Sequence, residues 1–107
     1  MVKLALLATL KAKSGKESEV EEFLKSALPL VEGEPDTRQW YALKFDDSTF
    51  GIFDTFDDEA GRDAHLNGKV AAALMEKADE LFSVAPDIKK VEILTSKTGE
   101  SASGASN

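Results

Sequence analysis

The chain has 107 residues, with 20 Asp and Glu against 13 Lys and Arg, which gives a formal net charge of −7. A chain of this length forms one domain, and its charge would repel a phosphate backbone, so we expect no nucleic acid partner. It has no cysteine and one histidine. This composition excludes disulfides, thiolate nucleophiles and a histidine-rich metal site within one chain.

The first segment, MVKLALLATLKAKSG, has a lysine followed by an apolar run, as a signal peptide does. The run is at the short end for a signal peptide, no small-residue cleavage site follows it, and it is far too short to span a bilayer. Its alternation predicts a strand instead. We therefore expect a cytoplasmic protein without a membrane partner.

The next segments predict a helix and a hairpin. Ser14 and Glu17 form a capping-box pattern, and apolar residues then recur at helical spacing as far as Val31, with Pro29 near the helix end. The segments TRQWYALKF and STFGIFDTF are rich in β-branched and aromatic residues and flank an Asp-Asp pair. This pattern predicts a β-hairpin.

A second helix is predicted from DDEAGRDAH to Phe82, with acidic residues in its first turn. Asn67 and Gly68 are poor helix formers and predict a kink or restart. Such a break either opens a pocket beside His65 or simply lets Gly68 pack closely. IKKVEILT predicts a last strand, and the small, polar residues 96–107 predict a disordered tail after a domain of residues 1–95.

The resulting order, β-α-β-β-α-β, predicts an α+β ferredoxin-like fold, in which both helices cover one face of a four-stranded antiparallel sheet. The other face would then be bare. Strand alternation places Tyr41, Leu43 and Phe45 on one side, opposite Trp40 and Ala42. A bare apolar face predicts a homodimer packed sheet to sheet, and a monomer with an exposed apolar sheet is the alternative.

His65 is the candidate catalytic residue because an imidazole titrates near pH ~6.5 and can serve as a general base. On a helical wheel it lies roughly 100° from the stripe of Ala64, Ala71 and Phe82, at the edge of the expected buried face. The alternative is a partly buried helix residue that hydrogen-bonds a neighbour.

Four further residues are candidates for substrate binding. Trp40 could stack on a flat ligand and bind an oxygen through its indole N–H, or belong to the core or an interface. Asp54 could orient His65 or bind a substrate hydroxyl, or be a solvated strand-end carboxylate. Phe53 could line a pocket or the core, and Asn67 adjoins the helix break.

The segment EGEPDTRQWYALKFD, with FGIFDTFDDEAGRDAHLNG, resembles the antibiotic biosynthesis monooxygenase (ABM) domain family, whose quinol-monooxygenase-like members are dimeric α+β barrels. The resemblance covers roughly residues 2–95. The positions that carry it are Glu34-Pro35-Asp36-Thr37, Phe53-Asp54, Asp57-Asp58-Glu59 and His65.

The chain also departs from this family pattern. Asp36 stands where the family usually has glycine, and Gly68-Lys69-Val70 stands where members often carry a second histidine. The haem-degrading branch resembles this fold but uses an Asn, a Trp and a helix His. Ala8 and Thr55 occupy about the first two of these positions and only His65 matches, so we do not expect haem degradation.

The resemblance implies oxidation of a small quinol or polycyclic phenol by O₂ without metal or flavin. A base removes a phenolic proton, the anion passes an electron to O₂, and a dry aromatic pocket holds the radical pair. The alternatives are a non-catalytic ligand-binding or structural dimer, and an isomerase or lyase on the same scaffold.

Overall fold

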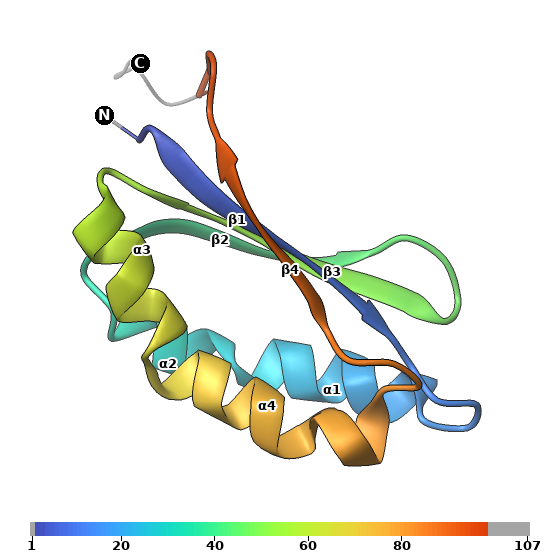
Figure 1. The fold of residues 1–107 in the computed structure, drawn as a ribbon. Helices are drawn as coiled ribbons and strands as arrows, with labels where there is room; N and C mark the ends of the chain where they lie inside the picture. Colours follow the sequence, from blue (N-terminus) through green and yellow to red (C-terminus); the bar gives the residue numbers. More distant parts are fainter. Residues whose placement is uncertain (1, 99–107) are drawn as a thin grey trace.

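The computed structural model describes residues 2–98. Its strands are β1 (Leu4–Lys11), β2 (Thr37–Lys44), β3 (Thr49–Phe56) and β4 (Asp87–Glu92), and its helices are α1 (Glu17–Ser26), α2 (Leu28–Glu32), α3 (Glu59–Leu66) and α4 (Lys69–Leu81). The strands form an antiparallel sheet in the order β2-β3-β1-β4, and the helices lie on one side of it (Figure 1). The predicted ferredoxin-like α+β fold is confirmed, with each expected helix divided in two.

The register of the sheet decides which side chains share a face, because directly paired residues of antiparallel strands point to the same side. One face of the sheet, which we call the covered face, packs against the helices and includes Leu6, Asp54 and Trp40 in one row across the strands. Within residues 2–98, no helix lies on the opposite face. The corresponding row on this helix-free face is Leu7, Phe53 and Tyr41.

The core lies between the covered face and the helices. Alternate residues of β1 and β3 pack against apolar residues of α1 and α4, which recur at helical spacing and so turn one stripe toward the sheet. The buried members of this cluster are Ala8, Leu10, Ala12, Val20, Leu24, Phe50, Ile52, Leu74, Leu81 and Phe82. The core therefore occupies the lower half of the sheet in Figure 1 and leaves the α3 end for a different set of contacts.

The first helical segment differs from the prediction in two ways. Ser14 is not the N-cap: α1 begins at Glu17 with Lys16 as N-cap, and the Glu17 carboxylate accepts a hydrogen bond from the Gly15 N–H at 3.0 Å. Gly15 has a φ of +87°, a conformation that favours glycine, and this turn moves the helix start past Ser14. Further along, Pro29 lies in the first turn of the separate helix α2, because proline has no N–H to continue α1.

The predicted break at Asn67-Gly68 is confirmed, since these two residues separate α3 from α4. A Cβ atom at Gly68 would lie 3.2 Å from the Ala64 carbonyl oxygen and 3.2 Å from a carboxylate oxygen of Glu34. The glycine therefore permits a close approach between the helix junction and the loop that carries Glu34.

Strand β4 is shorter than the predicted segment IKKVEILT, although the Ile93 N–H still donates to the Lys3 carbonyl. Of the predicted disordered tail, residues 96–98 are exposed and belong to no helix or strand, and residues 99–107 lie outside the described residues. Within residues 2–98, no helix is both long and apolar enough to cross a membrane. The cytoplasmic location stays a prediction.

Candidate functional site

His65 lies in the last turn of α3 with its ring directed at the sheet, and only 7% of its side chain is exposed. It is therefore more deeply buried than the edge position predicted from the helical wheel. Helix α3 begins after Asp58, the N-cap residue, whose side chain accepts a hydrogen bond from the Gly61 N–H. The His65 ring packs against the Phe56 ring, with centroids 5.5 Å apart.

Asp54 is the carboxylate that meets one ring nitrogen of His65. Its Oδ2 lies 2.8 Å from His65 Nε2, and its side chain is 1% exposed. The structure therefore supports the interpretation that Asp54 orients His65. It contradicts the alternative that Asp54 is a solvated carboxylate at the end of a strand. Asp54 Oδ1 is also buried, and it has no hydrogen-bond partner among the described residues.

Glu34, in the loop between α2 and β2, meets the other ring nitrogen. Its Oε1 lies 2.6 Å from His65 Nδ1 and accepts a hydrogen bond from the Thr37 hydroxyl at 2.8 Å. The sheet register shifts between Thr37 and Gln39. Because such a bulge reverses the alternation, Thr37 points to the covered face although Gln39 lies on the helix-free face. Glu34 and Thr37 stand in the motif that carries the family resemblance, but the sequence assigned no role to either residue.

The two carboxylates decide the protonation of His65. Burial disfavours a charged ring and by itself lowers the pKa of His65, but the hydrogen bonds and charges of Asp54 and Glu34 outweigh it, so the pKa is raised above 6.5. A protonated ring donates from both nitrogens, which matches an acceptor at each one. The site is thus a row of the Asp54, His65 and Glu34 side chains that joins β3, α3 and the α2–β2 loop.

His65 separates two cavities. The inner cavity, of about 30 Å³, is lined by Leu6, Ala8, Ile52, Asp54, His65, Leu66, Val70, Ala71, Leu74 and Ile88. The outer cavity, of about 170 Å³, is lined by Gly33, Glu34, Pro35, Asp36, Thr37, Gly61, Ala64 and His65. The inner cavity is thus apolar apart from Asp54 and His65, whereas the outer cavity is bordered by more polar side chains, those of Glu34, Asp36, Thr37 and His65.

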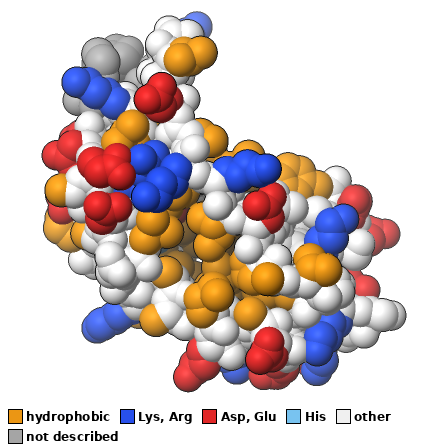
Figure 2. Space-filling model, viewed as in Figure 1, with side chains coloured by type: hydrophobic (Ala, Val, Ile, Leu, Met, Phe, Trp, Pro, Cys, Tyr) orange, Lys and Arg blue, Asp and Glu red, His pale blue; other side chains and the backbone are white. Residues whose placement is uncertain are grey.

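The inner cavity lies beside the sheet edge formed by β4, where Ile88 is 39% exposed. From the side shown in Figure 1, hydrophobic side chains gather around a hollow between the sheet and the helices (Figure 2). The enclosed volume holds a water-sized group. A ligand larger than water would therefore have most of its atoms outside the enclosed volume, at this hollow.

The other candidate residues are distributed differently. Trp40 lies on the covered face in register with Asp54 and packs against both core clusters. Phe53 lies on the helix-free face, on the other side of the sheet from His65. The prediction that Phe53 binds substrate beside His65 is therefore corrected. Asn67 is exposed, donates to the Asp63 carbonyl at 2.9 Å and is not among the residues that line the inner or outer cavity.

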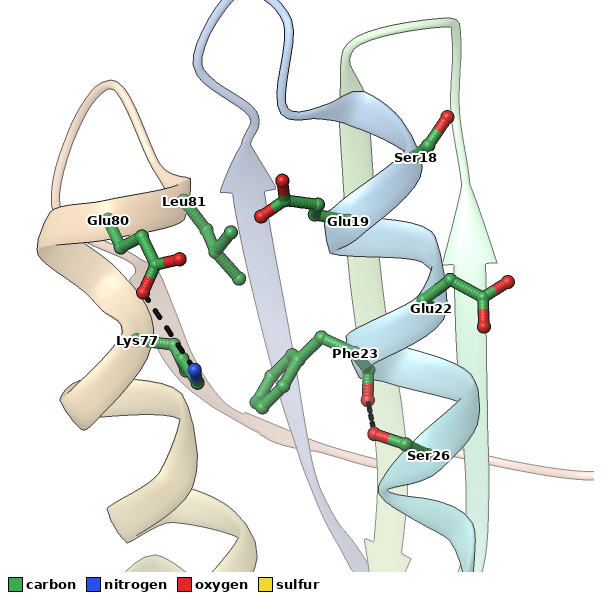
Figure 3. Close-up of a pocket in the computed structure, with 8 residues that line it drawn as sticks. All are labelled: Ser18, Glu19, Glu22, Phe23, Ser26, Lys77, Glu80 and Leu81. Atoms are coloured by element: carbon green, nitrogen blue, oxygen red, sulfur yellow. Dashed lines mark hydrogen bonds and ion pairs between the residues drawn. The ribbon is translucent and has the colours of Figure 1, made fainter.

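A larger cavity, of about 470 Å³, lies between α1 and α4, away from His65. Phe23 and Leu81 point into the space between the two helices, and Glu22 points away from it (Figure 3). Its charged groups are surface side chains, and Lys77 pairs with Glu80 at 3.8 Å. This groove therefore lacks the buried, converging polar atoms of the His65 site. Among residues 2–98, no group of three or more His, Asp or Glu side chains could hold a metal ion.

No family model matches the sequence, and no curated protein does. Among solved structures, a protein of unknown function from Nitrosomonas europaea, NE2512, is 56% identical, with a TM-score of 0.90 over 94% of this chain and 97% of that one. A "putative antibiotic biosynthesis monooxygenase" from Caulobacter crescentus is 16% identical (TM-score 0.73, 88% and 92% covered). One of the same name from N. europaea is 12% identical (TM-score 0.76, 86% and 90% covered).

Proposed function

Since the chain belongs to the same family as the N. europaea protein NE2512, whose function is unknown, and has the ABM fold, we propose that it is a cofactor-independent monooxygenase. Its substrate would be a small quinol or polycyclic phenol and its oxidant O₂. The observation that carries the proposal is Asp54, which lines the apolar inner cavity beside His65 and whose buried Oδ1 has no hydrogen-bond partner among the described residues.

Asp54 serves as the base in this proposal and His65 as the group that positions it. The sequence pointed to His65 as the base, but both nitrogens of its ring face carboxylates and its pKa is raised, so a protonated ring has no lone pair to offer. Asp54 Oδ1 can accept a phenolic proton while Oδ2 keeps its bond to His65. Glu34 balances the ring charge from the other side.

The oxidation then follows from the phenolate that Asp54 leaves behind. One electron passes from the phenolate to O₂, and the resulting radical pair combines to form a carbon–oxygen bond. The new bond joins O₂ to a ring carbon that bears a hydrogen, and the outer oxygen of the resulting peroxide anion takes back the proton that Asp54 held. Cleavage of the O–O bond then releases the outer OH together with the hydrogen of that carbon as water, and a carbonyl remains. One atom of O₂ thus enters the product and the other leaves as water, with the apolar lining of the inner cavity keeping solvent from the radicals.

A non-catalytic ligand-binding protein is the second candidate, and the inner cavity supports it because about 30 Å³ is too small to enclose an aromatic ring. Under the monooxygenase proposal, only the reacting hydroxyl or O₂ enters this cavity while the ring rests between β4 and α4. The two candidates differ in whether O₂ is consumed.

We also propose that the chain forms a homodimer through the helix-free face. Tyr41 and Phe45 are 50% and 55% exposed there. On this face, the residues of β1, β2 and β3 between Ala5 and Thr9, Gln39 and Leu43, and Gly51 and Thr55 carry no charge. Strand β4 adds Asp87 and Lys89 at the edge of the face, and these two side chains pair at 3.5 Å. A second copy of the same acidic chain could therefore pack on the part of this face formed by β1, β2 and β3 without opposing like charges.

Oxygen consumption with a panel of small quinols, corrected for oxidation in buffer, tests the proposed activity. Asp54→Asn keeps the side-chain volume and removes the base, so we expect the rate to fall by roughly 10²-fold. Leu28→Met, at an exposed position of α2 away from the inner cavity, is the control and should retain the wild-type rate. If the wild-type protein oxidises no quinol faster than buffer does, the ligand-binding alternative is favoured.

A further inference from the structure

Arg62 is a buried cation of α3, three residues before His65, and its side chain is 8% exposed. Its Nη1 donates to the Ala5 carbonyl at 3.3 Å and to the Val91 carbonyl at 3.2 Å, and its Nη2 donates to the Glu59 carboxylate at 2.8 Å. Its Nε is buried and has no hydrogen-bond partner among the described residues. The guanidinium is thus placed against the sheet although one of its donors is left unused.

Stability alone does not account for a buried arginine at this position. Removal of a cation from water is costly, and replacement of a buried ion pair by apolar side chains of similar size is often neutral or stabilising. The carboxylate partner of Arg62, Glu59, is itself 57% exposed and also lies 3.9 Å from Lys90 Nζ. A role in the geometry of the site therefore explains Arg62 better than a role in stability.

The two carbonyls that accept from Arg62 are next to the strand pair that holds Asp54. Ala5 and Val91 are directly paired across β1 and β4, and the residue after Ala5 is paired with Asp54 across β1 and β3. Residues three apart on a helix lie on one face, so Arg62 and His65 face the sheet together. Two consecutive turns of α3 are therefore tied to the sheet, by Arg62 at β1 and β4 and by His65 at Asp54 of β3.

We propose that Arg62 is a positioning residue, which fixes α3 on the sheet so that His65 Nε2 meets Asp54 Oδ2. Because the guanidinium is planar and its Nη1 bonds two carbonyls of paired strands, it resists sliding of α3 along the sheet. The inference rests on the proposed function for its chemical consequence, since Asp54 is the proposed base and His65 orients it. Without Arg62, the contact between His65 and Asp54 becomes looser, and Asp54 loses its fixed orientation toward the inner cavity.

The ring of His65 reports on this contact without any substrate. Burial alone lowers the pKa of the ring, and Asp54 from β3 and Glu34 from the α2–β2 loop raise it above 6.5. In an NMR titration of ¹⁵N-labelled Arg62→Met, a looser contact with Asp54 should lower the pKa of His65 toward 6.5 and move the Nε2 proton upfield. A purely electrostatic role predicts the opposite sign, because loss of a nearby positive charge favours the protonated ring and raises its pKa.

Two further variants separate position from charge. Lys90→Met is the matched control, because it removes a positive charge 3.9 Å from the same Glu59 carboxylate and leaves the bonds from α3 to β1 and β4 in place, so the pKa of His65 should not fall. Arg62→Lys keeps the charge but lacks the planar fork, and its pKa for His65 should lie between those of the wild type and Arg62→Met. In circular dichroism, the melting temperature of Arg62→Met should stay within about 5 °C of the wild type.

A pKa of His65 that is unchanged or raised in Arg62→Met would overturn the positioning role, and if that variant does not fold, an unchanged pKa in Arg62→Lys would do so. With quinols, Arg62→Met should lower kcat by up to roughly 10²-fold, the cost of a misplacement of about 1 Å. KM should stay within about 2-fold, because Arg62 is not among the residues that line the inner or outer cavity. The proposed function can fail separately: if the pKa falls as expected but the wild-type protein oxidises no quinol, Arg62 still positions His65 and the monooxygenase proposal falls.

Discussion

The two faces of the sheet are made from alternate residues of the same strands, but only the covered face buries charged side chains at its centre. On the covered face, Asp54 is 1% exposed and opposes His65, and its neighbour Trp40 has an unsatisfied donor. The adjacent residues Phe53 and Tyr41 lie on the helix-free face, where the central rows carry no charge in β1, β2 and β3 and β4 contributes the paired Asp87 and Lys89. A buried charge is expensive unless paired, whereas an apolar surface is stabilised simply by being covered. This difference is the reason that we propose a chemical role for the covered face and dimerisation through the helix-free face.

The largest expected effect is on dimerisation, and it compares the helix-free face with the rest of the surface. Tyr41→Asp places a charge on the helix-free face, and burying it unpaired in a dimer should raise the dissociation constant by roughly 10²-fold or more. Met75→Asp is matched to it, since Met75 is 57% exposed on α4 and Tyr41 is 50% exposed. Sedimentation velocity at micromolar concentration should show dissociation only for Tyr41→Asp. A wild-type protein that is monomeric under these conditions contradicts the proposed dimer.

The next effect is the pH dependence of the unfolding free energy that His65 creates on the covered face. Because the pKa of His65 is raised by folding, its stabilising contribution is fully present below the unfolded pKa of about 6.5 and is lost as the pH rises through the folded value. Each unit of separation corresponds to about 1.4 kcal/mol. The difference in unfolding free energy between the wild type and His65→Gln, measured with urea, should therefore shrink between pH 6 and pH 9. A difference that stays constant or grows would show that the ring is buried neutral.

The smallest effect compares one threonine from each face. Thr37→Val removes the hydroxyl that donates to Glu34 at 2.8 Å and should lower the unfolding free energy by about 1 kcal/mol. Thr9→Val on the helix-free face is the control, and a β-branched apolar residue there should be neutral or slightly stabilising. Equal effects from the two substitutions, measured by denaturant unfolding, would mean that the Thr37 hydroxyl adds nothing to the site.

Local patterns predicted much of the fold. Alternation in TRQWYALKF and STFGIFDTF anticipated the hairpin and placed Trp40 and Tyr41 on opposite faces, and the weak helix formers Asn67 and Gly68 marked the division between α3 and α4. The same alternation contained the signal that Phe53 lies opposite to Asp54. The capping box failed because Gly15 adopts a positive φ that no local pattern revealed.

The site was predictable only in part, because it depends on contacts between distant segments. His65 and Asp54 were recognised as candidates, but Glu34 is 31 residues from His65 and reaches it through the fold of the α2–β2 loop. Thr37 joins the site because the register shift before Gln39 reverses its direction. A bulge of this kind has no reliable mark in a single sequence, so the second carboxylate and its hydroxyl partner became apparent only in the structure.

The central claim is that His65 is a protonated ring held between Asp54 and Glu34, and the single histidine of the chain allows a direct test. An NMR titration of ¹⁵N-labelled protein follows Nδ1 and Nε2 of this one ring from pH 5 to pH 9. The account predicts that both nitrogens carry protons at pH 7 and that the midpoint lies above 6.5. A ring that is neutral at pH 7, with a midpoint at or below 6.5, would contradict it.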